Sequence, residues 1–216
     1  MPIVSRRATL LPMRAPPLPH AARLSPPRPW APLSDAEWHA LLPYLLPRSP
    51  QGRPIRELRA RMDAIFHTAC SQAPWADLPD RFGKPDTVSR YFRRLTHAGL
   101  WQRLLLALAE AAPAHPLRAI EHWICRAARR AHRILGLPLI LLVRRIGLRS
   151  ALPAPPWLLP DPLLSETLAA LPVPAAPPRG RGGKAWHRAL LGSMKRLLRD
   201  AGGRARIPRS VRLGWP

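Results

Sequence analysis

The chain has 216 residues, which is enough for one domain or two small ones. Its 35 lysines and arginines against 12 acidic residues give a formal net charge of +23, and nearly all of the basic residues are arginines. Such a surplus favours a polyanionic partner, either nucleic acid or an anionic membrane surface, while 30 prolines must interrupt regular structure in much of the chain.

The cysteines and the apolar runs exclude two further classes of protein. Cys70 and Cys125 lie far apart without paired spacing, which argues against a zinc site or a disulfide framework and fits a reducing cytoplasm. The longest apolar run, residues 134–143, is about half as long as a bilayer crossing requires. We therefore expect a cytoplasmic protein without a transmembrane segment.

Charge divides the chain into unequal parts. Residues 1–32 are rich in arginine and proline and contain no acid, so we predict a disordered basic leader. Residues 34–112 carry 11 basic and eight acidic side chains, whereas residues 113–216 carry 19 basic and four acidic ones. The balanced middle, residues 33–112, is where we expect a well-packed domain.

Helical signals follow one another through residues 33–112. Ser34 to Glu37 form a capping box, and a second helix is expected to open near Pro54. After a turn-rich stretch, residues 73–85, a basic helix is predicted from Asp86, as its N-cap, to His97. Gly99 ends this helix and a last one runs towards Pro113. No stretch alternates like a strand, so the predicted fold is all-α, a small helix-turn-helix bundle.

The helix predicted over residues 86–97 has one apolar and one basic side. In a helix-turn-helix pattern the second helix lies in the major groove, where its exposed side chains reach base edges and phosphates. The DNA-contacting candidates at this helix are Lys84, Thr87, Ser89, Arg90, Arg93, Arg94 and His97. The alternative is a basic face that is only solvated.

Arg53, between Gly52 and Pro54, is a further DNA-binding candidate. An arginine in an extended segment can enter a narrow minor groove, where the negative potential is enhanced. The alternative is a solvated arginine in a loop that enters the helix.

The order of short motifs along residues 33–108 resembles that of a known protein family. The motifs are Leu33-Ser34-Asp35-Ala36-Glu37-Trp38, Gly52-Arg53-Pro54, Trp75-Ala76-Asp77-Leu78-Pro79, Phe82-Gly83, Thr87-Val88-Ser89-Arg90-Tyr91-Phe92-Arg93-Arg94 and Gly99-Leu100-Trp101. In this order they resemble the N-terminal, insertion-element-like DNA-binding domain of bacterial insertion-sequence transposases. The resemblance implies a helical transposase-type DNA-binding domain over residues 33–112, double-stranded DNA as the partner and a location at the bacterial nucleoid.

Transposases of the resembled group cut DNA with an RNase H-like domain in which three carboxylates hold divalent metals. Beyond Pro113 the sequence has no strand-like alternation, and its acids are Glu121, Asp161, Glu166 and Asp200. We predict no catalytic residue, cofactor, metal site or small-molecule substrate. Catalysis would then come from a separately encoded transposase subunit.

The histidines offer no metal site either. They are scattered, and the closest approach to a ligand cluster is His115, His122 and Cys125, whose spacing matches no common zinc site.

The remainder of the chain is divided into three segments. Residues 113–150 are predicted to hold a basic amphipathic helix, 116–135, followed by a Pro-rich linker, 151–183, and a second basic helix with a tail, 184–216. Such helices bind nucleic acid backbone, membrane surfaces or partner proteins, or pack on the neighbouring domain.

Three functions remain open from the sequence. The first is the recognition part of an insertion-sequence transposase without its own catalytic domain. The second is a DNA-binding transcriptional regulator derived from a transposase, and the third is a basic membrane-surface or RNA-binding protein.

Overall fold

The computed structural model describes residues 22–46 and 57–216, and within them the regular structure is helical, as predicted. A single isolated bridge joins Arg23 to Leu148. The helices are α1 Asp35–Leu45, α2 Leu58–Ser71, α3 Pro85–His97, α4 Leu100–Glu110, α5 Pro116–Ala119, α6 Glu121–Leu135, α7 Leu137–Ile146, α8 Pro162–Ala170, α9 Gly183–Ala201 and α10 Arg209–Gly214. Short 3-10 turns lie at Trp75–Asp77, Asp80–Phe82, Arg149–Ala151 and Pro156–Leu158.

Helix α1 begins as the sequence predicts. The Ser34 side chain accepts from the Glu37 backbone N–H, and the Glu37 carboxylate accepts from the Ser34 backbone N–H, which completes the capping box. Helix α2 begins at Leu58, so the start predicted near Pro54 is wrong: its N-cap, Glu57, has a φ of +54°, and this left-handed conformation does not continue a helix. Pro54 itself lies outside the described residues.

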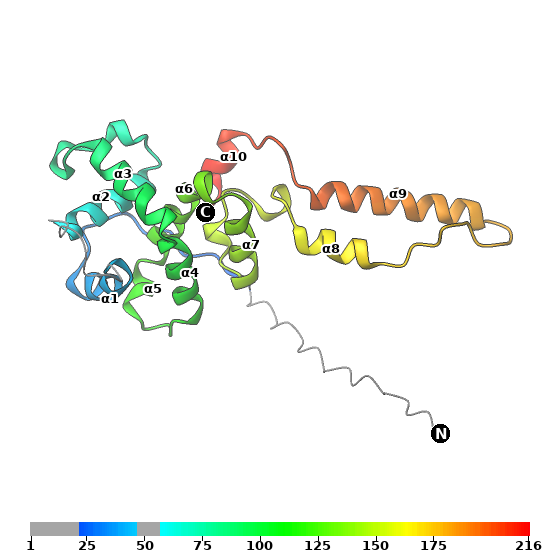
Figure 1. The fold of residues 1–216 in the computed structure, drawn as a ribbon, viewed down its shortest axis with the longest axis horizontal. Coiled ribbons are helices and arrows are strands. Elements are labelled where there is room, and N and C mark those ends of the chain that lie inside the picture. The colour runs from blue at the N-terminus through cyan, green and yellow to red at the C-terminus, as the bar shows by residue number, and fades with distance from the viewer. Residues whose placement is uncertain (1–21, 47–56) are drawn as a thin grey trace, which may run out of the picture.

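Helix α6 lies at the centre of the helical body, packed against α2, α3, α4 and α7 (Figure 1). Its apolar side is fully buried, and Trp123 lies beside Phe66 of α2 with ring centroids 6.0 Å apart. One hydrophobic core therefore runs from Leu33 to Leu159. The boundary that we placed at residue 112 does not correspond to a break in this core.

Residues 22–32, which we predicted as part of a disordered leader, lie against the helical body. The Arg23 N–H donates to the Gly147 carbonyl at 2.8 Å, and the Ser25 hydroxyl donates to Glu121 at 2.6 Å. Arg28 pairs with the buried Glu37 at 2.6 Å. Polar contacts to buried carboxylates thus hold this segment in place, although its proline content alone favours disorder.

The segment predicted as a Pro-rich linker also contains structure. Leu152, Ala154 and Leu159 are buried in the common core, and Pro162 opens α8 with the Asp161 side chain accepting from the Leu164 N–H. Helices α8 and α9 then form an arm that extends away from the body, and the chain returns through α10 (Figure 1).

Candidate nucleic-acid interface

Helix α3 is anchored by one buried side. Val88, Tyr91, Phe92 and Leu95 are at most 8% exposed and pack towards α2, α4, α6 and the turn at Trp75–Asp77. The apolar spacing of the sequence predicted this side correctly. Because four elements hold the helix, the orientation of its outer side is fixed.

Two hydrogen bonds at the junction between α3 and α4 also hold α3 in place. The Trp101 Nε1–H donates to the Thr96 hydroxyl at 2.8 Å, and that hydroxyl donates to the Phe92 carbonyl at 2.8 Å. Gly99, at φ +73°, makes the left-handed turn between the two helices.

The outer side of α3 carries the predicted ridge of basic side chains. Thr87, Arg90, Arg93, Arg94 and His97 are all exposed on it, and Lys84 is exposed directly before the helix. Their spacing of three and four residues places them along one face. The structure thus brings six of the eight predicted site residues together.

Local contacts of the ridge leave its cations accessible. Arg90 approaches Asp86 only to 3.8 Å, and both side chains are at least 80% exposed, so the pair is worth little in water. The Arg94 guanidinium lies 5.0 Å from the Tyr91 ring centroid, a cation–π contact that orients it without neutralising it.

Two predicted details of α3 are wrong. Ser89 is buried, and its hydroxyl donates to the Asp86 carbonyl, so it does not belong to the ridge. Asp86 is not the N-cap: the cap is Lys84 with Pro85 as the first helical residue, because proline's fixed φ suits that position. Arg53, the remaining predicted site residue, lies outside the described residues.

The connector between α2 and α3, residues 72–84, is long for a helix-turn-helix motif but well packed. Its Leu78 is buried, and Trp75 and Phe82 pack against the core. Trp75 contacts Phe92 of α3, with centroids 5.3 Å apart, and carries the Arg130 guanidinium 4.3 Å above its ring. The connector thereby links α3 to α6.

Several carboxylates have structural partners. Glu121 pairs with Arg23 and Arg118 at 3.0 and 2.8 Å, and Asp161 pairs with Arg144 at 2.9 Å. In the described part of the chain, no three histidine, cysteine or carboxylate side chains converge as metal ligands would.

The His115, His122 and Cys125 group noted in the sequence does not converge on one point. The His115 Nδ1 accepts from the Leu117 N–H at the start of α5. Burial lowers the pKa of His122 to about 4, with the Arg126 charge adding to the effect. Burial raises the pKa of Cys125 to about 12, so neither side chain is charged near neutral pH.

A second cluster of cations was not predicted as a site. Arg126, Arg129, Arg130 and Arg133 of α6 line a cavity together with residues of α10. The sequence signal was present, since these arginines recur at helical spacing on the side opposite the buried one. The return of the tail to this helix had no signal in the sequence.

In comparisons with known proteins, residues 33–105 match a family model. The family description is "Putative transposase of IS4/5 family (DUF4096)", and the match covers α1 to α3, including the α3 ridge, and the first part of α4. No curated protein and no solved structure matches the chain. None of the helices within residues 22–46 and 57–216 is long and apolar enough to cross a membrane.

Proposed function

We propose that the chain recognises double-stranded DNA as the recognition part of an insertion-sequence transposase, with α3 in the major groove. The observation that carries this proposal is the exposed basic ridge of α3 within the segment that matches the transposase family. An accessible row of arginines on a firmly packed helix is the arrangement that helix-turn-helix proteins use.

The ridge offers two kinds of contact to a duplex. The forked guanidinium groups of Arg90, Arg93 and Arg94 can pair bidentately with guanine O6 and N7 or with phosphate oxygens. Thr87 and Lys84, at the start of α3, can reach the backbone beside the groove. Because the opposite side of α3 is buried, the register of these contacts is set by the fold.

Catalysis, in this proposal, belongs to a separately encoded polypeptide. The pairing of Glu121 and Asp161 with arginines supports this division, since it ties up two of the carboxylates beyond Pro113. The chain binds the DNA ends of the insertion sequence, and the separate polypeptide supplies the metal-binding carboxylates that activate the attacking oxygen.

The test is fluorescence anisotropy of the full chain on duplexes from the ends of the genetic element that carries the gene, with scrambled duplexes beside them. We expect tighter binding to the end duplexes. The double variant Arg90→Ala/Arg93→Ala is expected to lose this preference by about tenfold or more, because each lost base contact is worth about 1–3 kcal/mol.

A variant with the same loss of charge serves as the control. Arg188 and Arg199 lie exposed on α9, in the arm away from the ridge, so Arg188→Ala/Arg199→Ala should keep the preference for the ends. Equal binding of the wild-type chain to both duplexes, or equal loss in both variants, contradicts the proposal. Addition of Mg²⁺ should leave the end duplex uncut.

A further inference from the structure

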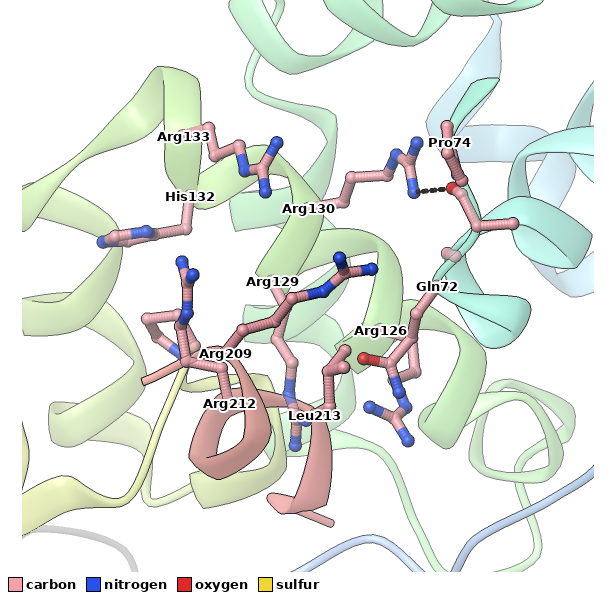
Figure 2. A pocket seen from close by; sticks show the side chains of 13 residues that line it. Gln72, Pro74, Arg126, Arg129, Arg130, His132, Arg133, Arg209, Arg212 and Leu213 are labelled. Carbon is pink, nitrogen blue, oxygen red and sulfur yellow. Dashed lines mark hydrogen bonds between the residues drawn. The ribbon is translucent and has the colours of Figure 1, made fainter. Parts of the chain in front are cut away.

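A cavity of about 430 Å³ lies between α6, α10 and residues 72–74 of the connector that follows α2 (Figure 2). Six of its lining residues are arginines, Arg126, Arg129, Arg130, Arg133, Arg209 and Arg212. Its volume falls within the range of about 300–1,000 Å³ that is usual for ligand sites. Among its described lining residues there is no carboxylate.

Helix α6 supplies four of these arginines at positions i, i+3, i+4 and i+7, so they form one row above the cavity. Two of them are held in place. Arg130 donates to the Ala73 carbonyl at 2.9 Å and stacks over Trp75, and Arg129 donates to the Ser150 carbonyl. Contacts with the fold therefore fix two of the four α6 arginines that line the cavity.

The C-terminal tail supplies the facing wall. Arg209 and Arg212 of α10 enter the space opposite α6, as Figure 2 shows. Trp215 docks the tail, because its Nε1–H donates to the Arg149 carbonyl at 3.2 Å and its own carbonyl accepts from Arg129 at 2.8 Å. Arg209 and Arg212 therefore lie beside the row of four α6 arginines, although about eighty residues separate the two groups in the sequence.

The charge of this cavity is not balanced from within. Elsewhere partly buried arginines meet carboxylates, as Arg144 meets Asp161 and Arg118 meets Glu121. None of the six cavity arginines forms an ion pair in the described part of the chain. Burial, together with the nearby positive charge of Arg126, lowers the pKa of Arg129 to about 9.

The pKa of Arg130, the next arginine of the row, is lowered in the same way. Burial, followed by repulsion from Arg133, lowers the pKa of Arg130 to about 10. Like charges held together at partly buried positions raise the free energy of the folded state. A bound anion with several oxygens would remove this repulsion and accept the guanidinium donors bidentately.

We propose that this cavity is a phosphate-binding site, which takes either the backbone phosphates of the bound duplex or a free polyphosphate. The proposal goes beyond recognition by α3, because it rests on α6 and the tail and would hold even if α3 read no sequence.

The first measurement is calorimetric binding of inorganic tripolyphosphate to the full chain, together with its effect on the melting temperature. The variant for comparison is Arg133→Ala/Arg209→Ala/Arg212→Ala, since all three side chains are exposed and their removal leaves the core intact. The matched control, Arg188→Ala/Arg196→Ala/Arg199→Ala, removes the same charge from exposed positions on α9.

For the wild type and the α9 control we expect tripolyphosphate binding and a rise in melting temperature that grows with ligand concentration. In the cavity variant the affinity should fall at least tenfold. Equal affinities of the cavity variant and the α9 control, or no binding by the wild type, would overturn the proposal.

A second experiment, measurement of duplex binding, distinguishes the two sources of phosphate. If the site holds duplex backbone, the cavity variant weakens binding to end and scrambled duplexes alike and reduces the slope of log K against log salt by about 2 to 3. If the site takes a free polyphosphate, duplex affinity matches that of the α9 control while tripolyphosphate binding is lost. Either result supports a phosphate site, and neither depends on the Arg90→Ala/Arg93→Ala result.

Discussion

At the scale of single residues, Glu121 joins the distant segment at residues 23–25 to the start of α6. Its side chain, 7% exposed, accepts from the Ser25 hydroxyl at 2.6 Å and pairs with Arg23 and Arg118. Burial alone would raise the pKa of Glu121, but the hydrogen bonds from Ser25 and Arg118 and the charge of Arg23 hold it below its ordinary value of 4.5. The ionised carboxylate therefore stabilises the fold.

We predict that Glu121→Gln lowers the free energy of unfolding by about 2–3 kcal/mol at pH 7, because charged hydrogen bonds are lost. A pKa lowered by folding stabilises the protein above the unfolded-state pKa, and this contribution disappears as the pH falls from there through the folded-state pKa. Urea unfolding from pH 7 to pH 3 should thus show the wild type and the variant converging below about pH 4.5. Curves that stay parallel over that range would contradict the assigned role.

Residue-level expectations were reliable where a single periodicity decided them. The spacing of Val88, Tyr91 and Leu95 placed the buried side of α3, and the exposed ridge followed from it. Ser89 lies at the edge of that side, where spacing does not separate buried from exposed positions. Asp86 failed as the N-cap because Pro85 competes for the first helical position.

At the scale of elements, α6 is the helix on which the others pack. Trp123 is fully buried beside Phe66, its Nε1–H donates to the Arg28 carbonyl at 3.2 Å, and the Arg28 guanidinium lies 4.3 Å above its ring. Removal of α6 would expose the apolar sides of α2 and α4. The segment that matches the transposase family therefore depends on a helix beyond its end.

We predict that Trp123→Ala lowers the free energy of unfolding by about 3–5 kcal/mol, as expected for a large side chain removed from a core. The matched control is Trp186→Ala on α9, where the side chain is 50% exposed and the expected change is within about 0.5 kcal/mol. A chain that ends at residue 112 should lose the cooperative urea transition of the full chain. Retention of that transition by the shortened chain would show that α6 is dispensable.

Elements with strong local signals could be predicted, and elements fixed by long-range contacts could not. The capping box of α1 and the glycine between α3 and α4 are local, and both lie where the sequence places them. The helix expected over residues 116–135 is divided at Ile120 into α5 and α6. Helix α10 is short and held by Trp215, a contact that periodicity does not reveal.

At the scale of the whole molecule, part of the net charge of +23 lies on two named surfaces. One is the exposed ridge of α3, which we propose to lie in the major groove, and the other is the arginine cavity between α6 and α10. Composition alone predicted a polyanionic partner, but only the fold shows that tail and body share a cavity. Base recognition and phosphate binding can thus be separated by mutation.

The most direct test of the central claim, that α3 reads bases in the major groove, replaces guanines of the end duplex by 7-deazaguanine. This change removes the N7 acceptor and leaves Watson–Crick pairing intact. We predict that at least one replacement weakens wild-type binding about tenfold and leaves the affinity of Arg90→Ala/Arg93→Ala unchanged, because the contact is already absent. Equal weakening of both proteins, or no weakening of the wild type at any guanine, would contradict recognition by these arginines.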